Sequence, residues 1–468
     1  MDVSPRDLPL AAELPPTLVE ELTLLLGERF TQSPGVCAHH GHDESHFPDR
    51  PPQAVAFVES REEIAALLRA CSAHRVPVIP FGAGSSLEGH VLAVHGGIAL
   101  DCTRMDRILE IEPADMLAVV QPGVTRKQLN NALRGTGLFF PIDPGADASI
   151  GGMTATRASG TNAVRYGTMR ENVLALEVVL ADGRILRTGT RAKKSSAGYD
   201  LTRLFVGSEG TLGVFSEVTV RLHPLPEEMA AAVVRFPSMQ AAVETVIRTI
   251  QSGVPVGRVE FLDEVSIHAI NRYSKTDLAE APTLFFEFHG SPSALEEQVA
   301  LVQELAREHG AEDFAWANRP EERSRLWEAR HQAYFACINL RPGCRGITTD
   351  SCVPISKLAE AVLRARAAID ASGLIAPILG HVGDGNFHTV ILIDPEDEAE
   401  LARAEALSAE LVAIAQSLGG TCSGEHGVGM GKREFVAHEA GEVGVALMRS
   451  IKAALDPKGI LNPGKLVP

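Results

Sequence analysis

The sequence predicts an α+β protein with more than one domain, on three observations. The chain has 468 residues, enough for two or three domains with cores of their own. Short strand–helix–strand units recur in its first half, whereas longer elements follow later. Between them stands His223-Pro-Leu-Pro226, a proline-rich stretch typical of a domain boundary. We expect an N-terminal arm over residues 1–50, one domain over 51–226 and a second over 227–468.

Composition argues against several classes of protein. Hydrophobic residues make up 45% and charged residues 22% of the chain, as in globular proteins. A net charge of −17 argues against binding to nucleic acid or to an anionic membrane surface. No apolar run is long enough to span a bilayer, and the first residues lack a secretory signal pattern. Seven cysteines without a Cys-x-x-Cys pair indicate reduced thiols and a cytoplasmic protein.

Periodicity and capping residues predict the individual elements. Ser60 with Glu63, and Thr125 with Gln128, form capping boxes at two helix starts, and Ser293 with Glu296 forms a third. Four histidines between Cys37 and His46 fit a solvated turn better than a metal site. The expected helices are 18–30, 239–250, 293–306, 321–338 and 396–418, and the expected strands are 54–58, 76–80, 118–121, 174–180, 184–188, 218–222, 230–236 and 283–289.

Two glycine-rich stretches are candidate ligand sites. Phe81 to His90 follows a buried strand and could present backbone N–H groups to phosphate, although it fits neither the Walker A nor the dinucleotide template. A plain tight turn is an equal alternative. The stretch from Pro141 to Thr168 is rich in Gly, Ser, Thr and Asn, which suits a flat polar ligand lying against it. A long surface loop is the alternative for this stretch.

The run His381-Val-Gly-Asp-Gly-Asn-Phe-His388 predicts a metal site. Apolar residues flank it, so it reads as strand, tight loop and strand, with His381 facing His388. Two imidazoles on opposed positions can hold one divalent metal, and Glu425 is a candidate third ligand. The alternative is a pair of hairpin histidines bonded to backbone.

In the helix 321–338, the residues Trp327, Arg330, His331 and Tyr334 share a face. The side chain of Arg330 on this face suits either a bound anion or a head group that reaches solvent.

Taken together, these stretches resemble the FAD-dependent 2-hydroxyacid dehydrogenases of the vanillyl-alcohol-oxidase superfamily. Within that group they look most like the cytochrome-linked D-lactate dehydrogenases. The resemblance runs from about Pro51 to Pro468 and is strongest over 80–89, 143–170, 207–213, 380–388, 424–432 and 462–465.

The resemblance implies a two-part PCMH-type FAD-binding domain, followed by an α+β cap of the FAD-linked oxidase C-terminal kind whose tail returns to the flavin. The FAD is expected to be non-covalent. The residues that would hold it are Phe81, Gly82, Gly84, Ser85, Ser86, Leu87, Gly89, Pro144, Gly145, Asp147, Ser149, Gly151, Gly152, Ser159, Gly160, Asn162, Arg165, Glu209, Gly210, Val214 and Asn462. Of these, Glu209, Gly210 and Val214 would lie on the adenine side.

The resemblance also implies the chemistry. His381, His388 and Glu425 would bind one divalent metal, for which zinc and manganese both fit. Arg330 would bind the carboxylate of a small 2-hydroxy acid, and His426 would be the general base. The electrons would pass to a separate acceptor, with cytochrome c, a quinone and an electron-transferring flavoprotein all open. A location in the cytoplasm is expected, with contact to the inner membrane through an acceptor left open.

Two positions bear on the substrate. Relatives that act on D-2-hydroxyglutarate carry a Lys and an Asn where this chain has Thr348 and Val390. Neither Thr nor Val neutralises a second buried carboxylate, which favours D-lactate. A D-2-hydroxyglutarate dehydrogenase or a glycolate oxidase subunit is the alternative. Non-redox flavin transferases of the alkylglycerone-phosphate synthase kind, a metal hydrolase and a non-catalytic flavin module are remoter alternatives.

Overall fold

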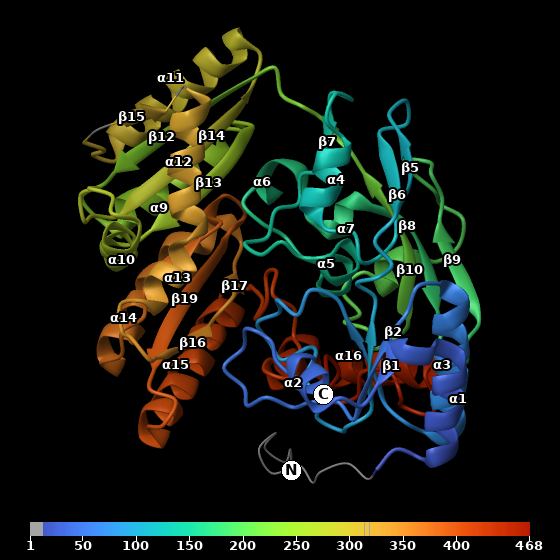
Figure 1. The fold of residues 1–468 in the computed structure, drawn as a ribbon. Coiled ribbons are helices and arrows are strands. Elements are labelled where there is room, and N and C mark those ends of the chain that lie inside the picture. The colour runs from blue at the N-terminus through green and yellow to red at the C-terminus, as the bar shows by residue number, and fades with distance from the viewer. Residues whose placement is uncertain (1–12, 313, 318) are drawn as a thin grey trace. The chain divides into compact units, whose positions relative to one another are not determined.

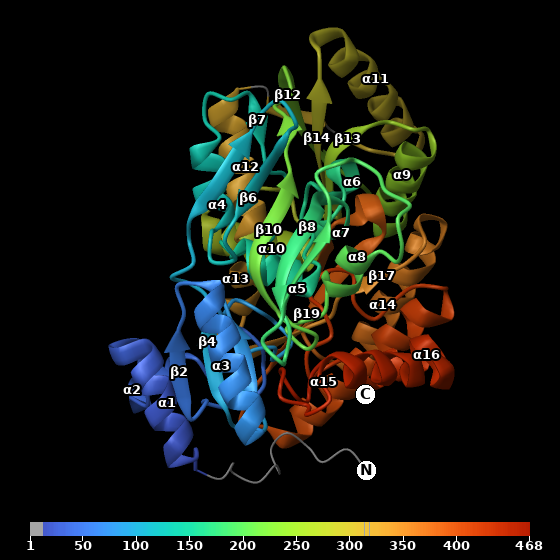
Figure 2. The same cartoon turned by 90° about the vertical axis from the view of Figure 1, so that its right-hand side faces the viewer.

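The computed structural model describes residues 13–312, 314–317 and 319–468 as a mixture of helices and strands, which confirms the predicted α+β class (Figure 1; Figure 2). The chain forms two compact units that exchange segments along the sequence. The first comprises the chain up to Ser159, then Gly167–Pro224 and Glu425–Pro468, and the second comprises Gly160–Tyr166 and Leu225–Gly424. The domain limits expected at residues 50 and 226 stay predictions, because the compact units interleave rather than follow one another.

The first unit contains a sheet with strand order β1-β2-β4-β3, in which β2, β4 and β3 run parallel. Helix α3 begins where predicted, with Ser60 Oγ accepting from the Glu63 N–H at 3.3 Å. The C-terminal segment continues the sheet, since Asn462 N–H donates to Val78 O at 2.9 Å. The elements of this part are α1 Pro16–Leu26, β1 Phe30–Thr31, α2 Pro34–His39, β2 Ala54–Phe57, α3 Arg61–His74, β3 Val78–Phe81 and β4 Ile98–Asp101, and Figure 2 shows α1 and α3 in blue beside β2.

A second sheet of the first unit is antiparallel, with order β5-β6-β10-β8-β9. The predicted hairpin is confirmed as β8 and β9, closed by Asp182 and Gly183. The predicted capping box is also confirmed, because Thr125 and Gln128 bond reciprocally at the start of α4. The elements are β5 Ile108–Glu112, β6 Leu117–Val120, α4 Arg126–Ala132, β7 Leu138–Phe139, α5 Ile150–Thr156, α7 Met169–Asn172, β8 Val173–Val179, β9 Ile185–Gly189, α8 Leu201–Phe205, β10 Val214–Arg221, β11 His223–Pro224 and α16 Arg433–Leu455.

The second unit is built on an antiparallel sheet with order β15-β12-β14-β13-β18-β19-β16, and β17 also pairs with β19. Helices α9, α11, α14 and α15 pack on one face, and α10, α12 and α13 on the other (Figure 1). Alternation along β13 sends Phe261 to the first face and Leu262 to the second. The elements are α6 Ala163–Tyr166, β12 Glu228–Arg235, α9 Met239–Gln251, β13 Val256–Leu262, α10 Glu264–Ser274, β14 Thr283–Gly290, α11 Pro292–Glu308, β15 Phe314–Ala317, α12 Pro320–His331, α13 Ala333–Ile338, β16 Arg345–Thr348, β17 Ser351–Cys352, α14 Leu358–Ser372, β18 Ile378–Gly380, β19 Asn386–Ile393 and α15 Glu398–Ser417.

Two local expectations are wrong, and one of the alternatives is excluded. The helix predicted over 321–338 is two helices, because α12 ends at His331 and α13 starts at Ala333. Helix α11 begins two residues earlier than its predicted capping box implies, since its N-cap is Ser291 and its first residue is Pro292, where proline is favoured. The stretch from Pro141 to Thr168 is not a plain surface loop, because it contains helix α5 with Ile150 and Met153 buried.

Part of that stretch belongs to the second unit. Asn162 Oδ1 accepts from Arg258 Nε at 2.9 Å, and the Tyr166 hydroxyl lies 2.9 Å from His289 Nδ1. His289 Nε2 faces the Glu287 carboxylate at 2.7 Å, so the proton is on Nε2 and Tyr166 donates to Nδ1. These bonds fasten residues 160–166 to β13 and β14.

Candidate functional site

The histidine hairpin of the second unit differs in register from the predicted one. Leu379 is opposite His388, so His381 lies two residues beyond the position directly across from it. The chain makes a short helical turn over Val382–Asp384 and closes it at Gly385, whose φ of +86° suits glycine. The predicted direct pairing is therefore wrong. The two imidazoles nevertheless come together, with ring centroids 5.3 Å apart and planes at 80°.

His381 is held by a carboxylate that sequence reasoning did not select. Glu260, on the neighbouring strand β13, is fully buried and places Oε1 2.7 Å from His381 Nδ1. In the neutral ring this acceptor favours a proton on Nδ1 and the lone pair on Nε2, the usual arrangement of a metal-binding histidine. Burial alone raises the pKa of Glu260, but the charges of His381 and Arg330 bring that pKa below its ordinary value. The residue is therefore a carboxylate.

His388 has a similar surrounding. Its Nδ1 lies 3.2 Å from Thr349 O and 3.5 Å from Asp350 Oδ1. Asp350 is fully buried and accepts from Asn386 Nδ2 at 2.8 Å and from Ser423 Oγ at 3.0 Å. Both histidines thus present Nδ1 to an acceptor oxygen. Histidines that bind a metal through one ring nitrogen usually donate the N–H of the other nitrogen to such an acceptor. The donor set of the second unit fits a divalent metal.

Arg330, on α12, lies on the same face of the sheet as these histidines. It is 6% exposed, and its Nη2 forms an ion pair with Glu260 Oε2 at 2.5 Å. Its buried Nε donates to no acceptor among the residues that the structure describes. The guanidinium is thus desolvated and carries a donor directed at no described group. A solvated head group, one of the two alternatives for Arg330, is wrong, and the geometry suits an anion.

The two positions that bear on the substrate are cross-strand neighbours. Thr348 of β16 is directly opposite Val390 of β19. Val390 is 1% exposed and packs with Trp327, on the face that also carries His388 by the two-residue alternation of the strand. Side chains at these positions therefore line the same side of the sheet as the histidines and Arg330.

Glu425 and His426 follow directly on the second unit along the chain. Gly424 N–H donates to Asp350 O at 3.0 Å, so the chain leaves this unit beside the carboxylate that faces His388. Glu425 and His426 begin the return to the first unit, and Glu425 Oε1 lies 3.9 Å from His426 Nε2. The role of Glu425 as third ligand stays a prediction, as does that of His426 as base.

A buried carboxylate holds the loop that follows His426. Glu209 Oε1 accepts from the Val428 N–H at 2.7 Å, and Oε2 accepts from the Gly429 N–H at 2.8 Å. Glu209 Oε2 also lies 3.2 Å from His90 Nε2. Burial alone raises the pKa of Glu209, yet the His90 charge and these N–H donors bring it below its ordinary value. The side chain of Glu209 therefore supports the His426 loop, and its predicted contact with adenine remains untested.

The first unit brings together the other predicted cofactor segments. At Gly82 a side-chain carbon would lie only 2.5 Å from Ser149 Oγ, so the Phe81–Gly89 loop touches the stretch before α5. Asn462 Nδ2 donates to His90 O at 3.1 Å and to Glu209 O at 2.8 Å. Its buried Oδ1 meets no donor among the described residues, which suits a polar ligand at this place. Of the predicted cofactor residues, Gly160, Asn162 and Arg165 belong to the second unit and the rest to the first.

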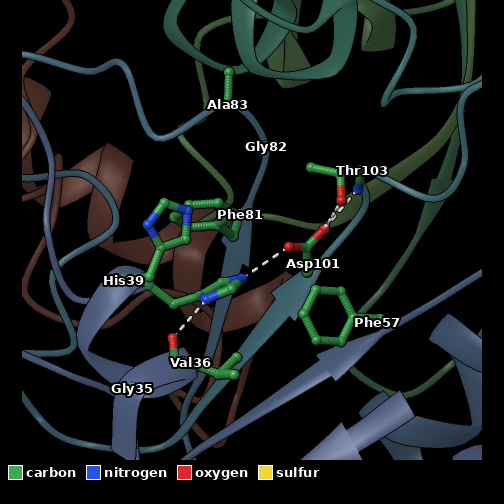
Figure 3. A pocket seen from close by; sticks show the side chains of 10 residues that line it. Gly35, Val36, His39, Phe57, Phe81, Gly82, Ala83, Asp101 and Thr103 are labelled. Carbon is green, nitrogen blue, oxygen red and sulfur yellow. Dashed lines mark hydrogen bonds and ion pairs between the residues drawn. The ribbon is translucent and has the colours of Figure 1, made fainter.

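A cavity of about 550 Å³ opens at the carboxyl ends of the parallel strands (Figure 3). Phe57, Phe81 and Asp101 line it from β2, β3 and β4, where ligands of parallel sheets bind. His40 is buried beside it, with Nε2 2.8 Å from Asp101 Oδ2 and Nδ1 2.8 Å from Val36 O. The expectation of a solvated turn is therefore wrong for His40. His40 can be buried because it is paired with Asp101, which is 61 residues away and gives no indication of this pairing in the sequence around His40.

Two family models match this chain. The model of the FAD binding domain matches residues 52–189, and that of the C-terminal domain of FAD linked oxidases matches residues 225–466. The chain belongs to the FAD-linked oxidases. The predicted resemblance and the predicted fold, a PCMH-like FAD-binding domain with an FAD-linked oxidase C-terminal domain, are thereby confirmed.

Relatives of this FAD-linked oxidase cover most of its length. A protein of Danio rerio named probable D-lactate dehydrogenase, mitochondrial, is 52% identical over 92% of this chain and 87% of its own. The D-lactate dehydrogenase [cytochrome], mitochondrial, of Arabidopsis thaliana is 45% identical over 97% and 81%. A solved p-cresol methylhydroxylase with substrate bound shares the fold, with a TM-score of 0.79 and 19% identity over 96% of each chain.

Two further properties of this FAD-linked oxidase concern its cysteines and the hydrophobicity of its helices. It is a flavoprotein oxidoreductase, and within the described residues its cysteines form no disulfide. Within the described part of the chain, no helix combines the length and apolar character needed to cross a membrane.

Proposed function

We propose that this protein oxidises D-lactate to pyruvate and transfers the hydride to non-covalently bound FAD. The observation that carries the proposal is the single carboxylate of Glu260, which joins His381 to Arg330. A 2-hydroxy acid offers a hydroxyl and a carboxylate on neighbouring carbons. The metal held by His381, His388 and Glu425 suits the hydroxyl, and the Arg330 guanidinium suits the carboxylate.

The residues of the chain then have distinct tasks. When bound, FAD accepts the hydrogen of Cα as hydride, and the divalent metal makes the neighbouring hydroxyl more acidic. Arg330 holds the substrate carboxylate and so fixes which face of Cα is presented. His426 takes the hydroxyl proton at its ring nitrogen. Asn462, the Phe81–Gly89 loop and the stretch around Ser149 hold the cofactor in this proposal.

The names of the relatives support D-lactate and a separate electron acceptor. Both the Danio rerio and the Arabidopsis thaliana proteins are named D-lactate dehydrogenases, and the second name adds a cytochrome. The uncharged pair of Thr348 and Val390 gives independent support, because neither side chain can neutralise a second buried carboxylate. A cytochrome is therefore the acceptor that we propose. The cytoplasmic location stays a prediction, and both of these relatives carry the word mitochondrial in their names.

The test is an anaerobic titration of the purified yellow protein with D-lactate, followed in the visible spectrum. Bleaching of the flavin band by D-lactate, but not by L-lactate, supports the proposal. Bleaching by D-2-hydroxyglutarate alone would overturn the substrate and keep the chemistry. No bleaching by any 2-hydroxy acid would overturn the reaction itself.

A further inference from the structure

One buried carboxylate of the second unit, that of Glu260, links the proposed metal ligand His381 to Arg330. Glu260 has no exposed surface and uses its two oxygens differently, Oε1 toward His381 Nδ1 at 2.7 Å and Oε2 toward Arg330 Nη2 at 2.5 Å. These partners come from separate elements, the loop after β18 and helix α12.

This arrangement is poorly explained by stability. Burying a carboxylate with its partners is often no more stable than a packed apolar cluster. Glu260 is directly opposite Phe285, on the face of the sheet that also carries Leu262. An apolar side chain at position 260 alone would leave the buried Arg330 guanidinium without this carboxylate, so the comparison applies only to the cluster as a whole. The carboxylate therefore has to be understood from what it does to its two partners.

The effect on His381 concerns the ring tautomer. A carboxylate at Nδ1 holds the ring in one rotation and keeps the lone pair on Nε2. The effect on Arg330 concerns direction, because the ion pair at Nη2 holds the planar guanidinium in one orientation. Its buried Nε is then presented at a constant angle to an incoming anion.

We infer that Glu260 is a positioning residue that couples metal binding at His381 to carboxylate binding at Arg330. The inference rests on the proposed function and adds a residue that touches neither metal nor substrate. Its consequence is that metal affinity and the KM of the 2-hydroxy acid change together when Glu260 is altered.

The structure provides a matched control on the next strand. Glu287 of β14 is also buried, and it also contacts a histidine and an arginine, His289 Nε2 at 2.7 Å and Arg258 Nε at 3.4 Å. Neither of those residues is a predicted metal ligand. Glu260→Gln and Glu287→Gln thus remove equivalent charges from equivalent surroundings.

The experiment compares the two variants with the wild-type holoprotein. Metal content per FAD is measured by elemental analysis, the affinity for Mn²⁺ and for Zn²⁺ by titration of chelator-treated protein, and KM for D-lactate with a dye acceptor. We expect Glu260→Gln to keep FAD, to bind metal roughly 10- to 100-fold more weakly and to raise KM about tenfold. Saturating metal should restore occupancy but leave KM high, since Arg330 stays misdirected. Glu287→Gln should bind metal like the wild type.

Several results would overturn the inference. Unchanged metal affinity in Glu260→Gln would do so, as would a weaker metal site without any rise in KM. An equal metal loss in Glu287→Gln would show a general effect of losing a buried charge. If Glu260→Gln does not fold, Glu260→Asp takes its place, because it keeps the charge and withdraws it by one carbon, and the same readouts apply. Failure of the proposed function is distinguishable, because it would appear in the wild type as a protein without metal or without bleaching.

Discussion

The cross-strand pair Thr348 and Val390 gives a prediction about substrate choice. We expect the double variant Thr348→Lys, Val390→Asn to gain activity on D-2-hydroxyglutarate and to lose activity on D-lactate. The two positions are directly opposite each other, and Val390 is 1% exposed on the face that carries His388. Directly opposed side chains have Cβ atoms roughly 4.5–5.5 Å apart, so Lys and Asn would point at one common place.

The size of the effect follows from hydrogen bonds to a charged group. A hydrogen bond to a buried carboxylate contributes about 1.5–3 kcal/mol. Since about 1.4 kcal/mol corresponds to a factor of ten, kcat/KM for D-2-hydroxyglutarate should rise roughly 10- to 150-fold. With D-lactate bound, the new polar groups have no partner, and kcat/KM for D-lactate should fall by about tenfold.

The assay is dye-linked turnover with each substrate, reported as the ratio of the two kcat/KM values. Ile391→Asn serves as the control, because Ile391 is fully buried on the opposite face of β19 and belongs to the other core. It should cost comparable stability and leave the ratio unchanged. A double variant with the wild-type ratio would refute the reasoning and show that other residues determine the substrate.

Three further predictions concern the base, the metal and the C-terminal tail. His426→Ala should keep its FAD and its metal but no longer bleach with D-lactate, and a variant that still bleaches would exclude His426 as the base. Removal of metal by a chelator should leave a yellow protein that D-lactate does not reduce until Mn²⁺ or Zn²⁺ is added back, whereas full reduction without metal would contradict the proposed role of His381 and His388. Burial lowers the pKa of Lys465 to about 7, below the pKa of the same residue in the unfolded chain. Above pH 7 the unfolded state therefore binds one more proton than the folded state, and the free energy of unfolding rises with pH. Relative to Lys465→Met, the wild type should gain about 1.4 kcal/mol of stability per pH unit from pH 7 to 10. Urea unfolding at several pH values measures this, and a constant difference between the two proteins would show that the buried amine stays charged.

The candidate site was predictable where chemistry is concentrated in a short stretch. His381 and His388 lie seven residues apart in one loop-and-strand segment, and the glycines of the Phe81–Gly89 loop lie within eight residues of one another. The exact register was not predictable, because the helical turn at Val382 and the glycine at Gly385 lengthen the loop without changing the flanking apolar pattern.

The supporting carboxylates could not be predicted in the same way. Glu260 is 70 residues from Arg330 and 121 residues from His381 along the chain. Its one local signal is a charged residue inside an apolar strand, which does not name a partner. His40 and Asp101 present the same difficulty, because they are 61 residues apart. Tertiary contacts, rather than propensity or spacing, decide these assignments.

The way in which the C-terminal segment enters the parallel sheet has a consequence for biosynthesis. Strand β3 bonds to Ile460 and Asn462 through Val78, so the sheet beneath the glycine-rich loop is incomplete until these residues emerge from the ribosome. About 380 residues separate these partners, which corresponds to roughly 20 to 80 seconds of translation at about 5–20 residues per second. During that time the edge of β3 is open, and open edges invite pairing with other chains. Residues 460–462 thus determine when the cofactor-binding unit can close, and a truncation that removes them acts on the yield of folded flavoprotein before it acts on turnover.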